Sequence, residues 1–403
     1  MLAISWYFLL LAAAVVRAAT YGVPFGRPHF LAGNPPNPNR PNLSGLAEHR
    51  QKTLRVATPP LRPIKRQASL SAGRCGVKFG TSCEKGECCS KEGWCGRGYY
   101  YCSSPACQIN HSDSCDASIR PEGRDTANVP RPRLGSVAYG EAIYHCEEYG
   151  AIALSYDDGP FEYTEDLLDL LAKYKAKATF FITGRNLGKG AINDRSKPWR
   201  AIIERMARDG HQIASHTWSH QRLTHLTKEQ FRRQMIYNEV ALADILGYFP
   251  TYMRPPYSAS DARVDGWLGD LGYHVTYFNL DTEGYLHDSP ALIQQSKGIW
   301  DAAVEGKNPA ATKWLQIEHD PVHQSVYNLT EHMLRSLTRN GFRSVTVGEC
   351  LGDPAENWYR RLSSPLSNAT VRPITAAEDA KQGLGHVPEA HEAFVNSFFD
   401  LFR

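Results

Sequence analysis

After its first twenty residues the chain has no apolar run long enough to span a bilayer, and its end, FDLFR, lacks the hydrophobic tail of a lipid-anchor signal. The N-terminal stretch MLAISWYFLLLAAAVVRAAT is apolar but short, carries no basic residue ahead of its apolar core, and ends in small residues. We interpret residues 1–19 as a cleaved signal peptide, with a membrane anchor as the alternative. This interpretation predicts a secreted protein without a membrane anchor.

Acidic residues are almost absent from the first 66 positions, where nine Lys and Arg residues face a single acid, Glu48. This segment carries a net charge of +8 in a chain whose total is +3, so the remaining residues carry −5. Such a balance argues against a nucleic-acid partner for the mature part. Residues 20–66 hold nine of the 25 prolines and end in Lys65-Arg66. We expect a disordered segment or a propeptide cleaved at that dibasic pair, although the pair could simply be solvated.

Cysteine is missing from most of the chain, because eight of the ten cysteines lie between Cys75 and Cys115. No two of them have Cys-x-x-Cys spacing and only His111 lies near, so a zinc knuckle is a weak alternative to disulfides. A unit this small needs crosslinks in place of a core, and disulfides indicate an oxidising compartment. We therefore predict a crosslinked module over residues 72–116 and a linker over 117–140. Possible glycosylation sites in such a compartment are Asn42, Asn110, Asn328 and Asn368.

Short β-rich runs alternate with helical patterns through residues 141–362, which we predict to form the large domain. The expected strands are 151–156, 178–183, 211–216, 251–255, 273–280, 313–319 and 343–348, and clear helical patterns cover 164–175, 198–209 and 227–247. This alternation predicts an α/β fold with a parallel sheet, a distorted (β/α) barrel of about seven units. Chemistry in such barrels collects where the strands end. Residues 363–403 form a C-terminal tail, either a docked amphipathic helix or a frayed end.

Two adjacent carboxylates, Asp157 and Asp158 in SYDDGP, follow the first predicted strand. They repel each other unless a metal ion or a base partner holds both, although a solvated turn would explain them too. His216 and His220 in SHTWSH are four residues apart, which on a helical turn places both imidazoles on one face. Two histidines and one carboxylate leave room for water on a catalytic zinc, but a histidine pair alone is often structural.

Two more strand ends complete a possible reaction centre. Arg254 in RPPYS precedes stiff prolines that could hold its guanidinium against a carboxylate, and His319 and Asp320 follow the strand LQIEH. Together with Asp157 these residues supply a base, an acid and an orienting charge beside a metal site.

The motif order SYDDGP, SHTWSH, RPPY, DTEGY, IEHD resembles the polysaccharide deacetylase family, the NodB-homology fold of carbohydrate esterase family 4, over roughly residues 146–350. The resemblance implies one divalent metal ion, zinc or alternatively cobalt, bound by Asp158, His216 and His220. It implies that Asp157 is the general base and His319 the general acid. Four further roles follow from it: Arg254 positions Asp157, Asp281 holds His319, the backbone N–H of Tyr257 stabilises the oxyanion, and Ile317 receives the acetyl methyl. Trp218 and Tyr285 are expected to contact the substrate, and Gly284 departs from the family by replacing an acidic residue.

The cysteine-rich unit resembles the hevein-like chitin-binding module through CCSKEGWCG and YYYC. By this resemblance Ser90 hydrogen-bonds to a sugar while Trp94 and Tyr101 stack on it, and Glu92 replaces an aromatic residue. The implied disulfides are Cys75–Cys89, Cys83–Cys95, Cys88–Cys102 and Cys107–Cys115. Cys146 and Cys350 flank the barrel strands and are expected to pair, with two buried thiols as the alternative.

These features predict a secreted, metal-dependent monomer, extracellular or in the cell wall, that removes acetyl groups from N-acetylglucosamine units of chitin or chitin oligosaccharides. Two other functions remain open on sequence alone. One is deacetylation of another polysaccharide, and the other is a non-catalytic protein that only binds chitin.

Overall fold

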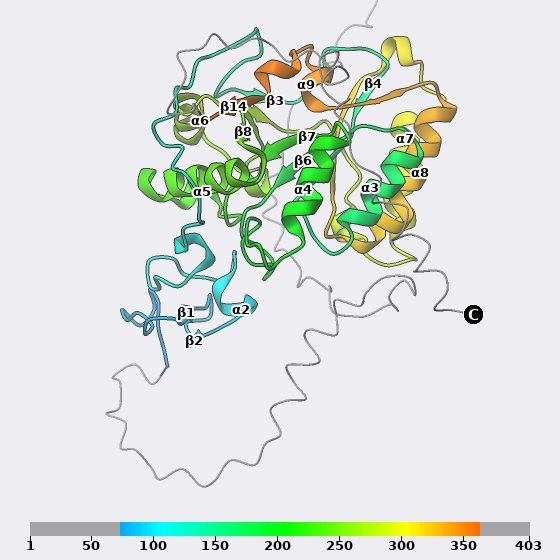
Figure 1. Ribbon diagram of the computed structural model, residues 1–403. Coiled ribbons are helices and arrows are strands. Elements are labelled where there is room, and N and C mark those ends of the chain that lie inside the picture. Colours follow the sequence, from blue (N-terminus) through cyan, green and yellow to red (C-terminus); the bar gives the residue numbers. More distant parts are fainter. Residues whose placement is uncertain (1–72, 363–403) are drawn as a thin grey trace, which may run out of the picture. The chain divides into compact units, whose positions relative to one another are not determined.

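The computed structural model describes residues 73–362, all within one compact unit, Arg66–Arg403. This unit contains a small crosslinked module and a large α/β domain (Figure 1). The predicted signal peptide, the Pro-rich segment 20–66 and the tail 363–403 lie outside the described residues, as do Asn42 and Asn368. Within residues 73–362 we find no helix with the length and apolar character needed to cross a membrane.

Disulfides take the place of a hydrophobic core in the module. Its regular structure is limited to β1 (Cys88–Cys89), paired antiparallel with β2 (Cys95–Gly96), and the short helix α2 (Tyr99–Cys102). All four expected pairings are confirmed: Cys75–Cys89, Cys83–Cys95, Cys88–Cys102 and Cys107–Cys115. Because no cysteine of the described range is free, the zinc-knuckle alternative is excluded there, although three of the sulfurs lie close together.

The large domain is built on a parallel sheet. Its strands are β3 (Ala142–Ile143), β4 (Ala151–Ala153), β5 (Ser155–Asp157), β6 (Thr179–Ile182), β7 (Gln212–Ser215), β9 (Tyr252–Met253), β10 (His274–Thr276), β11 (Leu280–Asp281), β12 (Trp314–His319) and β13 (Arg343–Val345). The strand order is β13-β4-β12-β5-β6-β7-β9-β10-β3, and β11 pairs with β12. Every pairing in this sheet is parallel, as predicted, and each predicted strand contains at least one observed strand. Among the described residues no pairing joins β3 to β13, so the barrel is open.

Helices cover the outside of the sheet (Figure 1). They are α3 (Thr164–Lys173), α4 (Trp199–Arg208), α5 (Lys228–Leu246), α6 (Ala262–Asp270), α7 (Ile293–Val304), α8 (Thr330–Arg339) and α9 (Val347–Cys350), while β8 (Tyr248–Pro250) and β14 (Tyr359–Arg361) form a separate antiparallel pair. The local sequence explains the bounds of α5, because Thr227 and Gln230 form a capping box at its start and Gly247 adopts a left-handed conformation at its end. In α3, Leu167, Leu168 and Leu171 are buried in the main hydrophobic core.

The parallel register places the candidate residues at one edge of the sheet. β12 pairs with β5 so that His319 lies opposite Asp157, and β7 pairs with β9 so that Ser215 lies opposite Met253. The residues that follow these strands therefore emerge side by side, which is where the sequence places its candidate chemistry.

The segment predicted as a linker, 117–140, contacts the barrel rather than crossing open solvent. Arg131 forms an ion pair of 2.8 Å with Glu239 of α5, and the Thr126 hydroxyl donates to the same carboxylate at 2.6 Å. Thr126 and Glu239 are both fully buried. These contacts hold the connection along α5.

The disulfide Cys146–Cys350 joins the residues ahead of β4 to α9 across 204 positions, and both cysteines are fully buried. Replacing both by Ala should lower the free energy of unfolding by about 5 kcal/mol, because the unfolded chain regains the entropy of a long open loop. Urea denaturation of wild type and the double variant measures this change. An unchanged midpoint would show that the crosslink does not stabilise the barrel.

Candidate metal centre and active site

Three potential metal ligands meet at the ends of β5 and β7. Asp158 follows β5, His216 follows β7, and His220 lies four residues further on. Ligand atoms of the three residues lie within 4.8 Å of one another. The Nε2 atoms of His220 and His216 are 3.3 and 3.8 Å from Asp158 Oδ1. The structure therefore brings together the three residues that the sequence proposed as ligands.

The loop that carries both histidines is not a helical turn, contrary to our expectation. Residues 216–220 form no helix, and Thr217 and His220 have positive φ angles of 71° and 55°. Asp158 also lies in this sparsely populated region, with φ of 77°. Left-handed backbone conformations, rather than helical spacing, thus aim two of the three ligands into the site.

The protonation of these residues suits a cation. The His216 Nδ1 atom lies 2.8 Å from the Arg254 carbonyl, to which it donates as N–H, so its Nε2 lone pair points into the site. Burial lowers the pKa of His220 to about 4, which leaves this ring neutral at neutral pH. Burial opposes ionisation of Asp158, but the neighbouring His220 and His216 hold its pKa below the usual range. Asp158 is therefore ionised and His220 neutral at neutral pH, as metal ligands must be.

A buried oxygen atom of Asp158 without a hydrogen-bond partner also supports a cation site here. Asp158 Oδ1 is buried and has no hydrogen-bond partner among residues 73–362. A buried carboxylate oxygen without a donor is costly unless something outside the protein binds it. One carboxylate and two imidazoles fit a divalent transition metal and leave positions for water. The chain therefore has a site that fits a divalent cation.

Beside the metal ligands, Asp157 forms a buried ion pair with Arg254. Arg254 Nη1 donates to Asp157 Oδ1 at 2.7 Å, and both side chains are at most 2% exposed. Arg254 is fixed in turn by Ser155 Oγ at 2.9 Å and by the Tyr277 carbonyl at 2.9 Å. The other oxygen, Oδ2, lies 3.7 Å from His216 Nε2. Arg254 thus binds one carboxylate oxygen of Asp157 while the other faces the metal ligands.

His319 ends β12 and is partly exposed, but it lacks the partner that we expected. Its Nδ1 atom is buried without a hydrogen bond in the described part of the chain. Asp281 accepts instead from the backbone N–H of Glu283 at 2.8 Å and from the Tyr285 hydroxyl at 3.3 Å. The expectation that Asp281 hydrogen-bonds to His319 is therefore wrong, because the loop that carries Asp281 uses both carboxylate oxygens itself.

A family model described as polysaccharide deacetylase matches residues 145–276. A chitin deacetylase from Pestalotiopsis sp is 40% identical over 238 residues, which cover 59% of this chain and 76% of that protein. The chain belongs to the polysaccharide deacetylase family. A probable peptidoglycan-N-acetylglucosamine deacetylase from Arthroderma benhamiae is 39% identical over 59% of this chain and 52% of that protein. The solved chitin deacetylase of Colletotrichum lindemuthianum aligns with a TM-score of 0.54 and 39% identity over 57% of this chain and 99% of that structure.

Membership in this family makes the chain a hydrolase that removes acetyl groups from a polysaccharide, as the motif series predicted. Three further predicted residues lie beside the reactive groups. Tyr257 has a left-handed backbone with φ of 61°, and its ring centroid is 4.5 Å from that of His220. Ile317 is almost buried on β12, two residues before His319 and therefore on the same face of the strand. The ring of Tyr285 meets that of His319 edge-on at 5.3 Å.

Trp218 cannot contact the substrate in this conformation, so that prediction is wrong. The side chain is fully buried, and its indole N–H donates to the Asp116 carbonyl at 2.9 Å. A Cβ on Gly184 would lie 2.1 Å from the indole ring, so a glycine is required beneath it. Trp218 is a core residue that anchors the loop carrying His216 and His220.

The sequence analysis did not identify Lys189, which stabilises the turn in the motif SYDDGP. Its ammonium group is buried and donates to the carbonyls of Asp158 and Gly159 at 2.9 and 2.8 Å and to Thr183 Oγ1 at 2.9 Å. These three bonds fix the turn that carries Asp158. The loop NLGKG contains no signal that would distinguish this lysine from a solvated one.

Glu318 was also missed, although it stands next to His319 in the motif IEHD. Its buried carboxylate accepts from the hydroxyls of Thr282 and Ser325. Burial raises the pKa of Glu318 to about 7 despite these two bonds. A Cβ on Gly284 would lie 2.3 Å from Glu318 Oε2, so the departure at position 284 makes room for this carboxylate.

Gly284→Ala should therefore destabilise the protein by roughly 1–3 kcal/mol, because the added methyl group overpacks the Glu318 carboxylate. Turnover should fall with stability, since the same loop carries Asp281 and Tyr285. Gly266→Ala in α6 is the matched control, because nothing lies within 4 Å of its added Cβ. Thermal unfolding of both variants tests this, and equal behaviour of the two would refute the packing constraint.

Proposed function

We propose that the chain is a secreted, zinc-dependent chitin deacetylase that hydrolyses the N-acetyl groups of N-acetylglucosamine units. The observation that carries this proposal is a deacetylase site in the same chain as a module with chitin-binding motifs. Relatives named chitin deacetylase share about two fifths of the aligned residues, as given above. The five disulfides of the described residues support an oxidising, extracellular location.

Asp158, His216 and His220 would hold the cation, for which zinc suits one carboxylate and two imidazoles. A divalent cation at this site would polarise the acetyl carbonyl and lower the pKa of a nearby water. The protein supplies the rest of the chemistry. Asp157, oriented by Arg254, accepts the proton from the attacking water. His319 at the end of the neighbouring strand donates a proton to the departing amine.

The accessory module would hold the polymer. Trp94 is 47% exposed, and the Arg74 guanidinium covers one ring face at 3.7 Å from the centroid. Its exposed aromatic surface suits the apolar face of a sugar ring. Ser90 is buried and its Oγ accepts from the Trp94 backbone N–H at 3.2 Å, so this hydroxyl supports the turn that presents Trp94. Tyr101 is half-buried and lies against Gly96.

Acetate release from chitin oligosaccharides, with and without a chelator, tests the proposed activity. We expect release that the chelator abolishes and that added zinc restores. Peptidoglycan is the competing substrate, because one relative carries that name, and it should yield less acetate. Absence of acetate from every polymer, with metal bound, would leave only a chitin-binding function.

Substitutions of the adjacent aspartates should separate their roles. Asp158→Asn should weaken metal binding, because a neutral amide replaces one of three protein ligands, and excess zinc should restore part of the activity. Asp157→Asn should retain the metal but lose about 100-fold or more in kcat, which added zinc does not restore. His319→Ala should behave like Asp157→Asn. Metal content and kcat of the three variants decide this, and metal loss in Asp157→Asn alone would reverse the assignment.

Trp94→Ala should weaken retention on insoluble chitin about fivefold, which corresponds to the loss of about 1 kcal/mol of stacking. Activity on short soluble oligosaccharides should stay unchanged, because none of the contacts described for Trp94 reaches the barrel. Pull-down on chitin beads together with acetate release measures both effects. Undiminished retention would place the sugar contact elsewhere.

A further inference from the structure

The crosslinked module contacts the loop that carries both histidine ligands. Ser104 Oγ of the module donates to the His220 backbone carbonyl at 2.6 Å. Asp116, directly after the last module cysteine, accepts the Trp218 indole N–H on its backbone carbonyl at 2.9 Å. Residues of the module thus bind this loop at two places, one of them a metal ligand.

These contacts are buried, so breaking one of them would cost considerable free energy. Ser104 and Asp116 are 6% and 7% exposed, and Trp218 is fully buried. A donor or acceptor that loses its partner in such a place bears the full cost of desolvation. Ser104 Oγ also lies 3.2 Å from the Tyr257 hydroxyl, so the same module residue reaches a second side chain beside the metal ligands.

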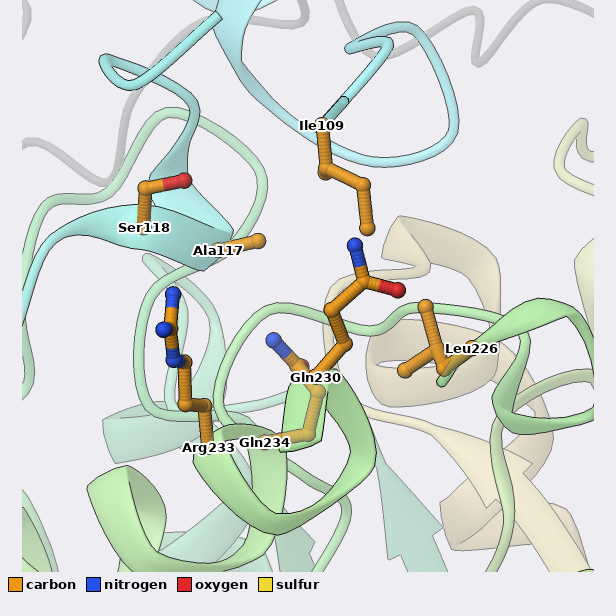
Figure 2. A pocket seen from close by; sticks show the side chains of 7 residues that line it. All are labelled: Ile109, Ala117, Ser118, Leu226, Gln230, Arg233 and Gln234. Atoms are coloured by element: carbon orange, nitrogen blue, oxygen red, sulfur yellow. The ribbon is translucent and has the colours of Figure 1, made fainter. Parts of the chain in front are cut away.

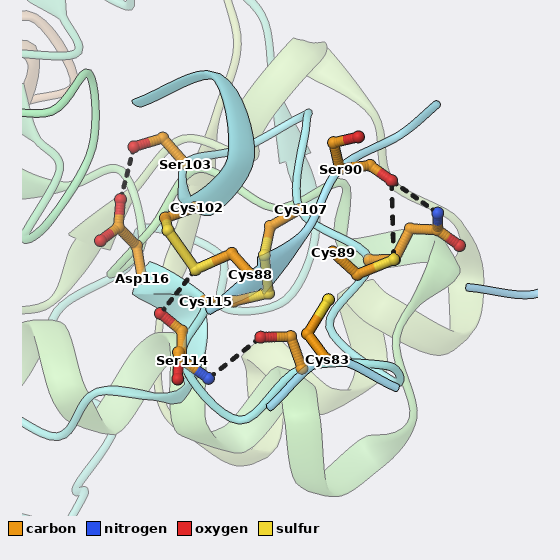
Figure 3. The surroundings of a disulfide bond; sticks show 12 residues. Cys83, Cys88, Cys89, Ser90, Cys102, Ser103, Cys107, Ser114, Cys115 and Asp116 are labelled. Atoms are coloured by element: carbon orange, nitrogen blue, oxygen red, sulfur yellow. Dashed lines mark hydrogen bonds between the residues drawn. A yellow bond between two sulfur atoms is a disulfide. The ribbon is translucent and has the colours of Figure 1, made fainter. Parts of the chain in front are cut away.

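The module residues are themselves held in place. The Asp116 carboxylate accepts from Ser103 Oγ at 2.5 Å within the module (Figure 3) and from Arg185 Nε of the barrel at 2.7 Å. The disulfides Cys88–Cys102 and Cys107–Cys115 end one residue before Ser103 and Asp116. The crosslinks therefore fix the positions of the groups that contact the barrel.

Apolar packing accompanies the polar contacts. Ile109 packs against the module cluster and also against a barrel cluster that contains Leu226. The space left between Ile109 and Ala117 on one side and Leu226 and Gln230 on the other is a cavity of about 40 Å³ (Figure 2). A cavity of this size holds water rather than a sugar, so the two surfaces pack closely.

The metal-binding loop needs such support. Thr217 and His220 have left-handed backbone conformations, which persist only where surrounding contacts impose them. The barrel supplies part of this restraint through Gln234, which accepts from the backbone N–H groups of Trp218 and Ser219 at 2.9 Å each. The Trp218 indole and the His220 carbonyl, by contrast, are bonded to the module.

We propose that the crosslinked module is a structural part of the metal centre, in which Ser104 and Asp116 position the histidine loop for metal binding. Ser104 and Asp116 are positioning residues, because they act on the metal only through His220 and Trp218. This inference rests on the proposed function of Asp158, His216 and His220 as metal ligands. It adds a role for the module that does not depend on sugar binding.

Ser104→Ala in the full chain tests the proposal, with zinc affinity measured by competition against a chromophoric chelator. Loss of a bond that orients a metal ligand should weaken zinc binding about 10-fold. Ser112→Ala is the matched control, because Ser112 is equally buried at 8% and donates to a carbonyl within the module, Glu87, at 2.8 Å. Its zinc affinity should equal that of wild type. Both variants should keep their retention on insoluble chitin, which shows that the module is folded.

Trp218→Phe provides a second variant, because it removes the N–H that binds the Asp116 carbonyl and, although phenyl is smaller than indole, keeps an aromatic ring in the core. It should also weaken zinc binding. If Ser104→Ala and Trp218→Phe bind zinc as tightly as Ser112→Ala, or if all three weaken equally, the proposal is wrong. Failure of the proposed metal site would give a different result from failure of this inference, because the wild type itself would then bind no zinc.

Discussion

The parallel register of β5, β7, β9 and β12 determines where chemistry can occur in this protein. Because the strands run in one direction, the residues that follow them share one edge of the sheet. The backbone N–H of Arg254 donates to the Ser215 carbonyl at 3.0 Å, so Arg254 and His216 emerge together. A slip of one residue in either strand would turn its functional side chain to the opposite face. The hydrogen bonds of the sheet therefore set the geometry of the site.

Buried charge is the second constraint on the site. Arg254 is fully buried, and its cost of desolvation is offset by Asp157 and by several neutral acceptors. Removing one partner of such a pair leaves an uncompensated ion, which typically costs about 3–5 kcal/mol. Asp158 Oδ1 and His319 Nδ1 are among the buried atoms that have no hydrogen-bond partner in the described residues. Both atoms belong to residues of the candidate site, where a bound cation or substrate would supply the missing partner.

The sequence predicted the parallel α/β fold and the three candidate ligands that the structure brings together, because alternating elements and short motifs are local signals. The prediction of a helical turn at residues 216–220 was wrong, because distant contacts impose left-handed backbone conformations on Thr217 and His220. Trp218 was assigned to the substrate because an exposed and a buried tryptophan look the same in a motif. Its burial depends on Gly184 and Asp116, which the fold alone brings near. Long-range hydrogen bonds of this kind leave no pattern in a single sequence.

The crosslinked module and the barrel both contact the loop that carries the proposed ligands His216 and His220, and together they hold its left-handed backbone in place. The most direct test of the metal centre is X-ray diffraction above and below the zinc absorption edge, from crystals of the zinc-loaded protein. We predict one anomalous peak about 2.0–2.2 Å from an Asp158 carboxylate oxygen and from Nε2 of His216 and His220. A peak bound by Asp157 instead, or no peak at these three residues, would contradict the assignment of metal ligand and general base.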